Sequence, residues 1–384
     1  SHAHNDGKLL IQVSSTVKAL GDLASEWRKS FPGLRLAAIT GSNGKTTTKE
    51  MASSIVSLKY KTLKNAGNFN NLIGLPLTLF RLDDSYKAAV VELGMNDFGE
   101  IGRLAEIAHP DTGAITNIGR AHLVKLGGLE GVAQAKGELV EGFSGDRVFV
   151  VNADDPRIYR ISRNVICRKI TFGIKTGGAD ITAKDVERDG FSGITFRMTA
   201  DGRDFPVRIN GIGMHNVMNA LCASGIALSF GCGKEEIAEG LLNFHPSYMR
   251  LELLDSPAGF RVINDTYNAN PDSMRSAIDE LMRLKGNGRA IAVLGDMLEL
   301  GESSEVEHVG IGEYLSASGV DFVVASGKFG QSILRGAGAD KNCLYAPSHD
   351  EAAKAIMEIA RPGDLVLVKG SRGMRMEEVT KMLV

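Results

Sequence analysis

Two kinds of hydrophobic pattern alternate along the chain from about residue 34 onward. Short apolar or β-branched runs are followed by longer stretches in which apolar residues recur at helical spacing. The predicted strands cover residues 34–40, 88–93, 112–117 and 147–152, and later 260–264, 290–295, 321–325 and 364–368. Strands that alternate with helices in this way predict βαβ units, and therefore an α/β fold with mostly parallel sheets.

The middle of the chain interrupts this alternation. Residues 165–210 form short alternating stretches with Gly and Asp at the turns, which predicts a small antiparallel insertion. A helical pattern returns over residues 215–230, and Pro246 then marks a connection, since proline ends helices. The remaining strands predict a second α/β unit that ends in a helix over residues 374–383. A separate helix is predicted over residues 17–29.

Composition and charge limit the classes of function. The chain has 384 residues, with 44 Lys and Arg against 46 Asp and Glu, so its net charge is −2 and no nucleic-acid partner is expected. Its four cysteines form no C-x-x-C pair, so we expect reduced thiols in a cytoplasmic protein. No apolar run approaches the ~18 residues of a membrane-spanning helix, so no membrane span is predicted.

The strongest candidate for chemistry follows the first strand. TGSNGKTTT (40–48) lies between a predicted strand and a predicted helix, where glycines let backbone N–H groups surround phosphate oxygens. Lys45 would reach the β- and γ-phosphates of ATP, and Thr46 would bind Mg²⁺. The usual pattern has glycine where this chain has Ile39, and a turn without ligand is the alternative. The predicted ATP-binding residues of this loop are Gly41, Ser42, Asn43, Gly44, Lys45, Thr46 and Thr47.

Two further candidates follow other predicted strands. Glu92 ends the strand at 88–93, and His122 follows the strand at 112–117. In open parallel sheets, ligands bind beyond the carboxyl ends of the strands, so both residues share an edge with the phosphate loop. Either one alone would be read as solvated or hydrogen-bonded, but beside a phosphate loop they predict a Mg²⁺ site.

Helices and turns of the first unit add weaker candidates. Lys136 lies on a predicted helix, where a solvated lysine is the ordinary interpretation. Asn68 and Asn71 lie in a turn-prone stretch that either caps a helix or contacts substrate. Asn216 and Asn219 are three residues apart, so they share one helix face and could present amides to a nucleobase.

The second unit has polar residues just after two of its strands. Asp265 could accept hydrogen bonds from a ribose, as acidic residues do at comparable strand ends. An Asx turn and helix cap before Pro271 is the alternative interpretation of this segment, and both could hold. The turn after the strand at 364–368 is similar to an anion-binding turn. The candidates for substrate contact in these two segments are Tyr267, Asn268, Asn270, Ser371 and Arg372.

These motifs, in this order, resemble those of the Mur ligase family. The stretches that carry the resemblance are TGSNGKTTTKEM, NFNNLIGLPLTL, VVELGMN, TNIGRAHL, AKGE, NADDP, GMHNVMNAL, RLE, NDTYNANPDSM, VLGDMLELG and VKGSRGMRME. The resemblance implies a central P-loop ATPase domain at 31–246 and a Rossmann-like domain at 247–384. Residues 1–30 would be the remnant of an N-terminal domain that binds uridine diphosphate, so weak binding of that part of the substrate is expected.

The resemblance also implies an activity. TTTKEM, YNANPDSM and LGDMLELG are most similar to the family member that adds D-alanyl-D-alanine to UDP-N-acetylmuramoyl-tripeptide in peptidoglycan synthesis. ATP would phosphorylate the tripeptide carboxylate, and the dipeptide amine would then attack the acyl phosphate. Another superfamily ligase similar to folylpolyglutamate synthase, or a non-catalytic ATP-binding remnant, are the alternatives. A monomer is expected.

Metal ligands follow from the same resemblance. Thr46 and Glu92 would bind one Mg²⁺ ion, and His122 would bind a second. Lys136 matches a family lysine that CO₂ carbamylates. Because a carbamate is an anion, Lys136 would then help to hold the metal instead of being a solvated cation.

The resemblance also implies nucleotide contacts from both domains. Asn216 and Asn219 would contact the adenine. Arg250 and Asp265 would close over the γ-phosphate and the ribose as the C-terminal domain moves in.

Overall fold

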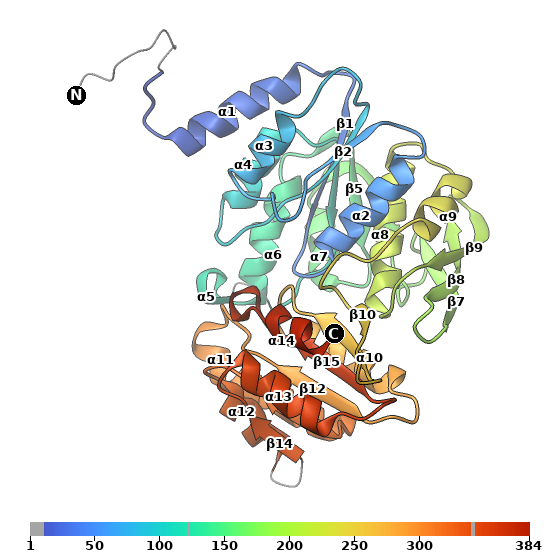
Figure 1. Cartoon of the computed structure of the whole chain (residues 1–384). Coiled ribbons are helices and arrows are strands. Elements are labelled where there is room, and N and C mark those ends of the chain that lie inside the picture. The colour runs from blue at the N-terminus through green and yellow to red at the C-terminus, as the bar shows by residue number, and fades with distance from the viewer. Residues whose placement is uncertain (1–10, 121–122, 339–341) are drawn as a thin grey trace.

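The computed structural model describes residues 11–120, 123–338 and 342–384, and it places two α/β units one above the other (Figure 1). Within these residues the upper, central unit contains a six-stranded sheet in which all neighbouring strands are parallel. Its strands, in spatial order, are β2 (Thr62–Lys64), β3 (Ala88–Glu92), β1 (Arg35–Thr40), β4 (Thr112–Ile115), β5 (Ser144–Asn152) and β6 (Ile166–Phe172).

Helices cover both faces of this sheet, which is why its inner strands β1, β3 and β4 are buried along almost their whole length. One face packs against α2 (Lys45–Val56), α8 (His215–Ser229) and α9 (Lys234–Leu242). The other face packs against α1 (Thr16–Lys29), α3 (Gly74–Leu79), α4 (Glu100–Ala108), α6 (Leu129–Gly137) and α7 (Pro156–Arg163). The short α5 (Leu123–Leu126) precedes α6, and a 3₁₀ turn (Glu138–Val140) follows it.

The antiparallel insertion is smaller than the sequence predicts. It consists of β7 (Thr182–Arg188), β8 (Ile194–Ala200) and β9 (Arg203–Ile209), whose inner residues join the core around α8. The prediction that the segment from residue 165 belongs to it is wrong, because β6 pairs in parallel with β5. As an edge strand, β6 exposes Ile166, Arg168 and Lys169 and buries Ile170 and Phe172. Its mixture of polar and apolar residues is therefore like that of the antiparallel strands that follow it.

The lower, C-terminal unit has a mixed sheet. In spatial order its strands are β10 (Glu252–Asp255), β11 (Arg261–Asp265), β15 (Leu365–Lys369), β12 (Ala290–Leu294), β13 (Phe322–Ala325) and β14 (Asn342–Tyr345), and β10 is antiparallel to β11. One face packs against α10 (Pro271–Leu284), α11 (Ser304–Ser318) and α12 (Gly330–Ala337). The other packs against α13 (His349–Ile359) and α14 (Glu377–Leu383), and 3₁₀ turns cover Gly301–Ser303 and Arg372–Met374.

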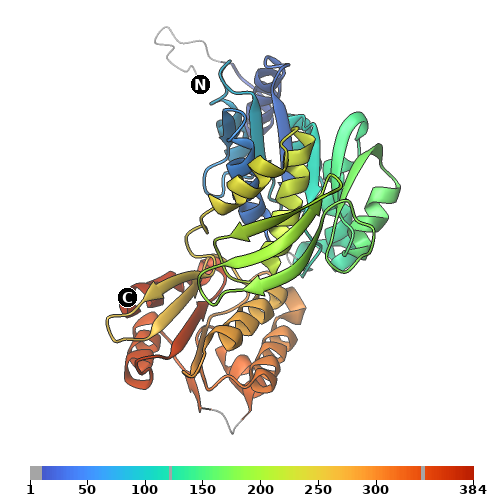
Figure 2. The same ribbon diagram turned by 90° about the vertical axis from the view of Figure 1, so that its right-hand side faces the viewer.

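The insertion reaches from the central unit to the C-terminal one, as its position between the two units in Figure 2 shows. Arg188 at the end of β7 is ion-paired with Glu280 of α10 at 3.3 Å. Arg261 of β11 lies over the ring of Phe191, 4.0 Å from its centroid. These contacts join the two units away from the strand ends where the phosphate loop lies.

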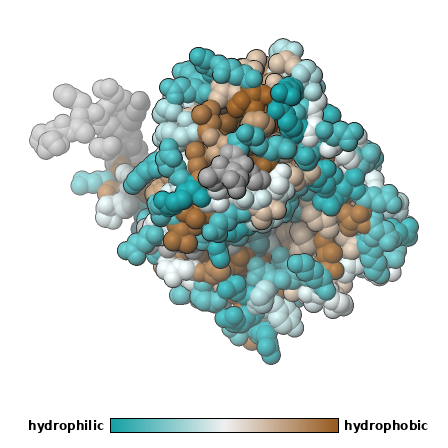
Figure 3. Space-filling view, turned by 90° about the horizontal axis from the view of Figure 1, so that it is seen from below, coloured by the Kyte–Doolittle hydropathy of each residue, from teal (hydrophilic) through white to brown (hydrophobic). Residues whose placement is uncertain are grey.

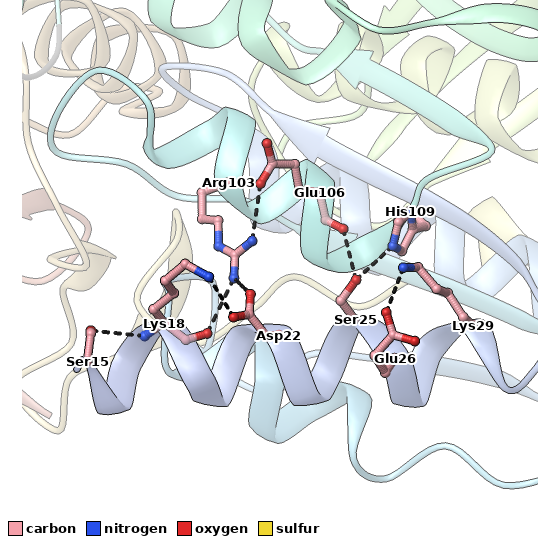
Figure 4. A network of polar contacts seen from close by, with 9 residues as sticks. All are labelled: Ser15, Lys18, Asp22, Ser25, Glu26, Lys29, Arg103, Glu106 and His109. Carbon is pink, nitrogen blue, oxygen red and sulfur yellow. Dashed lines mark hydrogen bonds and ion pairs between the residues drawn. The ribbon is translucent and has the colours of Figure 1, made fainter. Parts of the chain in front are cut away.

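The helix α1 is fastened to α4 by a network of polar contacts (Figure 4). Arg103 is ion-paired with Asp22, and the hydroxyl of Ser25 donates to the carbonyl of Glu106 at 3.3 Å and contacts His109 Nε2 at 2.7 Å. Gly21 permits the close approach, because a Cβ there would lie 2.7 Å from a methyl group of Ile107. The helix therefore belongs to the packed body of the central unit.

Among the described residues, no helix is long and apolar enough to cross a membrane. On the face seen from below, hydrophobic residues gather in separate areas among hydrophilic side chains (Figure 3).

Candidate active site

The phosphate loop has the geometry that its glycines predict. β1 ends at Thr40 and α2 begins at Lys45, and between them Gly41 and Gly44 have φ angles of +149° and +81°. A Cβ at Gly41 would lie 1.9 Å from the hydroxyl of Thr116, so only glycine fits there. Ile39 is a buried residue of β1, so the loop starts at Gly41 and is shorter than the usual pattern.

A second loop, after β4, forms the wall of this phosphate loop. The backbone N–H of Ser42 donates to the carbonyl of Asn117 at 3.0 Å, and that of Asn43 donates to Asn117 Oδ1 at 2.9 Å. The hydroxyl of Thr116 donates to the carbonyl of Asn43 at 2.6 Å. The sequence alone does not predict these roles of Thr116 and Asn117, although both lie in the TNIGRAHL stretch that carries the resemblance.

Lys45 lies at the first helical position of α2, where the helix N-terminus favours anions. Its ammonium folds back onto the loop and donates to the carbonyls of Gly41 at 2.8 Å and Ser42 at 3.4 Å. Burial lowers the pKa of Lys45; nearby Glu92 opposes this shift and Arg250 adds to it. A phosphate group would replace these weak carbonyl contacts with an opposite charge.

Glu92 ends β3 beside the loop, as predicted, and is buried. Asn70 Nδ2 donates to its Oε1 at 2.5 Å, while Asn65 bonds to both the backbone N–H and the carbonyl of Glu92 at 3.1 and 3.2 Å. The other oxygen, Oε2, is buried without a hydrogen-bond partner among the described residues. A buried carboxylate oxygen without a partner is costly unless something is bound to it, so it is a candidate cation ligand.

The buried Lys49 side chain holds Asn65, which in turn bonds to Glu92. Its ammonium donates to the carbonyl of Asn65 at 2.8 Å and pairs with Glu50 at 3.0 Å. Asn65 and Asn70 are therefore the asparagines of this stretch that bond to Glu92.

Under the ATP- and Mg²⁺-dependent activity that the resemblance implies, we expect Asn70→Ala to lower turnover at limiting Mg²⁺ by about 10- to 100-fold, since a metal ligand depends on the partner that orients it. The measurement is the Mg²⁺ dependence of phosphate release. Asn164→Ala, at the exposed C-terminus of α7, is the control and should leave that dependence unchanged. An unchanged Mg²⁺ requirement in Asn70→Ala would show that this hydrogen bond does not position Glu92.

Lys136 is buried in α6 with 2% of its surface exposed, so the interpretation as a solvated lysine is wrong. Its ammonium makes no hydrogen bond or ion pair with a described residue. Burial lowers the pKa of Lys136 well below its usual range, and the positive charge of Lys45 adds to this. A neutral amine in such a place is a nucleophile, the form that reacts with CO₂. The predicted metal ligand His122 lies outside the described residues.

The C-terminal unit touches the phosphate loop at two points. Arg250 Nη2 donates to the hydroxyl of Thr46 at 3.0 Å, and its guanidinium lies over the ring of Tyr267 at 3.9 Å. Asn270 caps α10 and its Nδ2 donates to Asn43 Oδ1 at 2.8 Å. Tyr267 and Asn270, predicted to contact substrate, thus lie where the two units meet.

The loop after β4 is held from the other side of the same interface. Asp272 of α10 accepts from the backbone N–H of Arg120 at 3.1 Å, and Glu307 of α11 is ion-paired with the Arg120 side chain at 2.7 Å. The C-terminal unit therefore contacts both the phosphate loop and the loop after β4 that packs against it.

Asp265 ends β11 and is ion-paired with the buried Lys369 at 2.5 Å. Lys369 also donates to the carbonyl of Asn268 at 2.9 Å. Ser371 is buried and its hydroxyl bonds to Ala269 and to Leu298 within the unit. In this structure, Ser371 therefore holds together the loops around Asp265.

The other predicted residues differ in their burial and in their hydrogen bonds. Asn219 Oδ1 faces Gly44, where a Cβ would lie 2.3 Å away, and its Nδ2 donates to Asn216 Oδ1 at 3.0 Å. Asn71 caps the start of α3 through Gly74 at 2.8 Å, which agrees with the capped-loop interpretation. The remaining predicted residues are Thr47, which is half-buried, and Asn68 and Arg372, which are exposed or mostly exposed.

Comparisons with known proteins agree with this geometry. The model of the Mur ligase middle domain matches residues 39–227, and that of the "Mur ligase, glutamate ligase domain" matches residues 249–372. A UDP-N-acetylmuramoyl-tripeptide–D-alanyl-D-alanine ligase of Bacillus subtilis (strain 168) is 39% identical over 379 residues, which are 98% of this chain and 81% of the relative. The chain belongs to the Mur ligase family.

Solved structures place this Mur ligase beside MurF proteins. MurF from Acinetobacter baumannii superposes with a TM-score of 0.90 at 35% identity, over 97% of this chain and 81% of that one. MurF from Thermotoga maritima in complex with ADP superposes with a TM-score of 0.88 at 28% identity, over 100% of this chain and 86% of that one. A folylpolyglutamate synthase from Mycobacterium tuberculosis is 16% identical with a TM-score of 0.75, which shows a shared fold alone.

Proposed function

We propose that this Mur ligase uses ATP to join D-alanyl-D-alanine to UDP-N-acetylmuramoyl-tripeptide in peptidoglycan precursor synthesis. The observation that carries the proposal is the contact of Arg250 with Thr46, which brings a second unit onto the phosphate loop in a chain 39% identical to a ligase of that name. ATP use is supported by the related MurF structure in complex with ADP.

The reaction needs activation because a carboxylate is a poor electrophile. A carboxylate oxygen of the tripeptide attacks the γ-phosphorus of ATP, and ADP leaves. The amine of D-alanyl-D-alanine then attacks the acyl carbon, loses a proton and displaces phosphate, which leaves a new amide. Catalysis of such a transfer consists mainly of positioning and charge stabilisation.

This chain supplies both kinds of help from opposite sides. The backbone N–H groups of Gly44 to Thr47, at the N-terminus of α2, would surround the phosphates, while those of Ser42 and Asn43 donate to Asn117 and hold the loop in shape. Lys45 exchanges its loop carbonyls for the transferred phosphoryl group and neutralises its charge. Arg250, already at the hydroxyl of Thr46, adds a second cation from the C-terminal unit.

Mg²⁺ fits the donors that this site presents. Among the described residues no group of three or more His, Cys, Asp or Glu side chains comes together. Mg²⁺ instead is usually held by one or two carboxylates and by substrate phosphates. Beside the phosphate loop, Glu92 Oε2 is a buried carboxylate oxygen without a hydrogen-bond partner among the described residues. Thr46 and Glu92 would hold one ion, and His122 with a carbamylated Lys136 a second. When bound, Mg²⁺ neutralises charge on the phosphates.

The two ends of the nucleotide would lie in different units. We infer that Asn216 and Asn219, beside Gly44, face the adenine, and that Asp265 accepts from the ribose. Tyr267, Asn268, Asn270, Ser371 and Arg372 are proposed for the acceptor side, while Asn68 and Asn71 are proposed for the tripeptide side.

We expect phosphate release only when ATP, Mg²⁺, UDP-tripeptide and D-alanyl-D-alanine are all present. ATP and the tripeptide form the acyl phosphate, the dipeptide displaces phosphate from it, and Mg²⁺ supports the transfer without being consumed. The measurement is phosphate release with each component omitted in turn, with L-glutamate replacing the dipeptide as a control for a folylpolyglutamate-synthase-like activity. Release that needs glutamate would support that alternative, and release with neither acceptor nor tripeptide would contradict ligase activity.

A further inference from the structure

Arg250 is presented to the phosphate loop by a strained turn. Its neighbours Met249 and Leu251 have φ angles of +60° and +49°, in the left-handed region that side chains other than glycine rarely adopt. Backbone strain of this kind persists only where surrounding contacts hold it, and it gathers at functional sites. The contacts that hold this turn therefore decide where the guanidinium points.

Two carboxylates hold the backbone of the turn. Glu252 Oε2 accepts from the backbone N–H of Met249 at 3.2 Å, and Asp265 Oδ1 accepts from that of Leu251 at 3.2 Å. The carbonyl of Met249 accepts from the backbone N–H of Tyr267 at 3.2 Å. The turn is thus fixed on both sides of Arg250 by groups of β10 and β11.

Glu252 is itself held in place by the interior of the C-terminal unit. Its Oε2 also accepts from Asn264 Nδ2 at 2.9 Å, and the register of β10 and β11 sets the two residues opposite each other. Asn264 and Thr266 are fully buried and bond to each other at 2.7 Å. A chain of hydrogen bonds therefore runs from this interior through Glu252 to the turn.

We propose that Glu252 is a positioning residue of the ligase reaction, which holds the turn that aims Arg250 at Thr46 and the transferred phosphate. This rests on the proposed function, because Arg250 matters only if phosphate is transferred there. Glu252 itself contacts neither Thr46 nor the loop. Its effect passes through the 3.0 Å bond of Arg250 and the stacking of that guanidinium on Tyr267.

Three substitutions separate geometry from charge. Glu252→Gln keeps an oxygen of the same reach, which can accept both hydrogen bonds, whereas Glu252→Asp keeps the charge but is one methylene too short. Glu252→Ala loses both. We expect kcat to be highest in Glu252→Gln, lower in Glu252→Asp and lowest in Glu252→Ala. The loss in Glu252→Ala should be about 10- to 100-fold, since small misplacements of catalytic groups cost that much. Asp255→Ala, an exposed residue of the same strand, is the control and should match the wild type.

A double mutant tests whether the effect passes through Arg250. Glu252→Ala added to Arg250→Ala should lower kcat no further, because coupled residues are not additive. Independent losses that multiply, or an Asp variant more active than the Gln variant, would overturn the proposal. If Glu252→Ala does not fold, the activities of Glu252→Gln and Glu252→Asp still test the proposal. A wild type without product refutes the proposed function, whereas a normal wild type with unaffected variants refutes only this inference.

Discussion

Replacing Lys45 with alanine is expected to remove ATP turnover while the fold stays intact. The side chain is the cation of the phosphate loop, and its only described partners are the carbonyls of Gly41 and Ser42. The loop itself is held by other contacts, such as that of Ser42 with Gly119 at 3.0 Å. Loss of one preorganised charge at a developing negative charge costs at least about 100-fold in kcat.

The experiment compares phosphate release and thermal unfolding of Lys45→Ala with those of Lys354→Ala. Lys354 is an exposed lysine of α13 in the C-terminal unit, so it controls for the loss of a positive charge. We expect unfolding of both variants near that of the wild type and turnover only in Lys354→Ala. Turnover in Lys45→Ala at the wild-type rate would show that the loop at 41–47 is not where ATP reacts.

Replacing Lys136 with methionine is expected to stabilise the protein and to abolish its activity. The buried amine has no described partner, and leaving such a group unpaired costs about 1–3 kcal/mol. Because burial lowers the pKa of Lys136, the unfolded chain binds a proton that the folded one does not at pH values between this lowered pKa and the usual pKa of lysine. The free energy of unfolding of the wild type therefore rises with pH up to the usual pKa of lysine, and the advantage of Lys136→Met shrinks over that range.

Carbamylation predicts a second difference between these proteins. The amine of Lys136 adds to CO₂ and releases a proton, which gives an anion beside the charge of Lys45. Bicarbonate should therefore raise the Tm of the wild type but not that of Lys136→Met. Lys136→Ala should regain part of its activity with short carboxylic acids such as acetate. Full activity of Lys136→Ala without such an acid, or an equal response of both proteins to bicarbonate, would contradict a carbamate.

The phosphate loop could be predicted from the sequence because its geometry is local. Gly41 and Gly44 are required by backbone angles and by contacts that a Cβ would violate, and the following helix starts where the pattern says. The start of α7 is local in the same way, since the side chain of Asp155 caps it and Pro156 is its first residue. Helices and buried strands of this length carry their own periodicity, so most of the α/β fold follows from it.

What the sequence could not supply depends on neighbours distant in the chain. β2, β10 and β14 have only three or four residues each and no clear alternation, so nothing but their partner strands marks them. In the run of asparagines before α3, the loop shape decides that Asn65 and Asn70 reach Glu92. Likewise, the burial of Lys136 comes from the packing of α6 and leaves no mark in the helical pattern.

The fate of one oxygen atom tests the ligase mechanism most directly. Tripeptide substrate labelled with ¹⁸O in its terminal carboxylate is incubated with ATP, Mg²⁺, D-alanyl-D-alanine and the protein, and product and phosphate are weighed by mass spectrometry. If the carboxylate attacks the γ-phosphorus, each released phosphate carries one ¹⁸O, and a pentapeptide product of matching amount appears. Product formed with unlabelled phosphate, or phosphate released without product, would contradict the mechanism proposed for this chain.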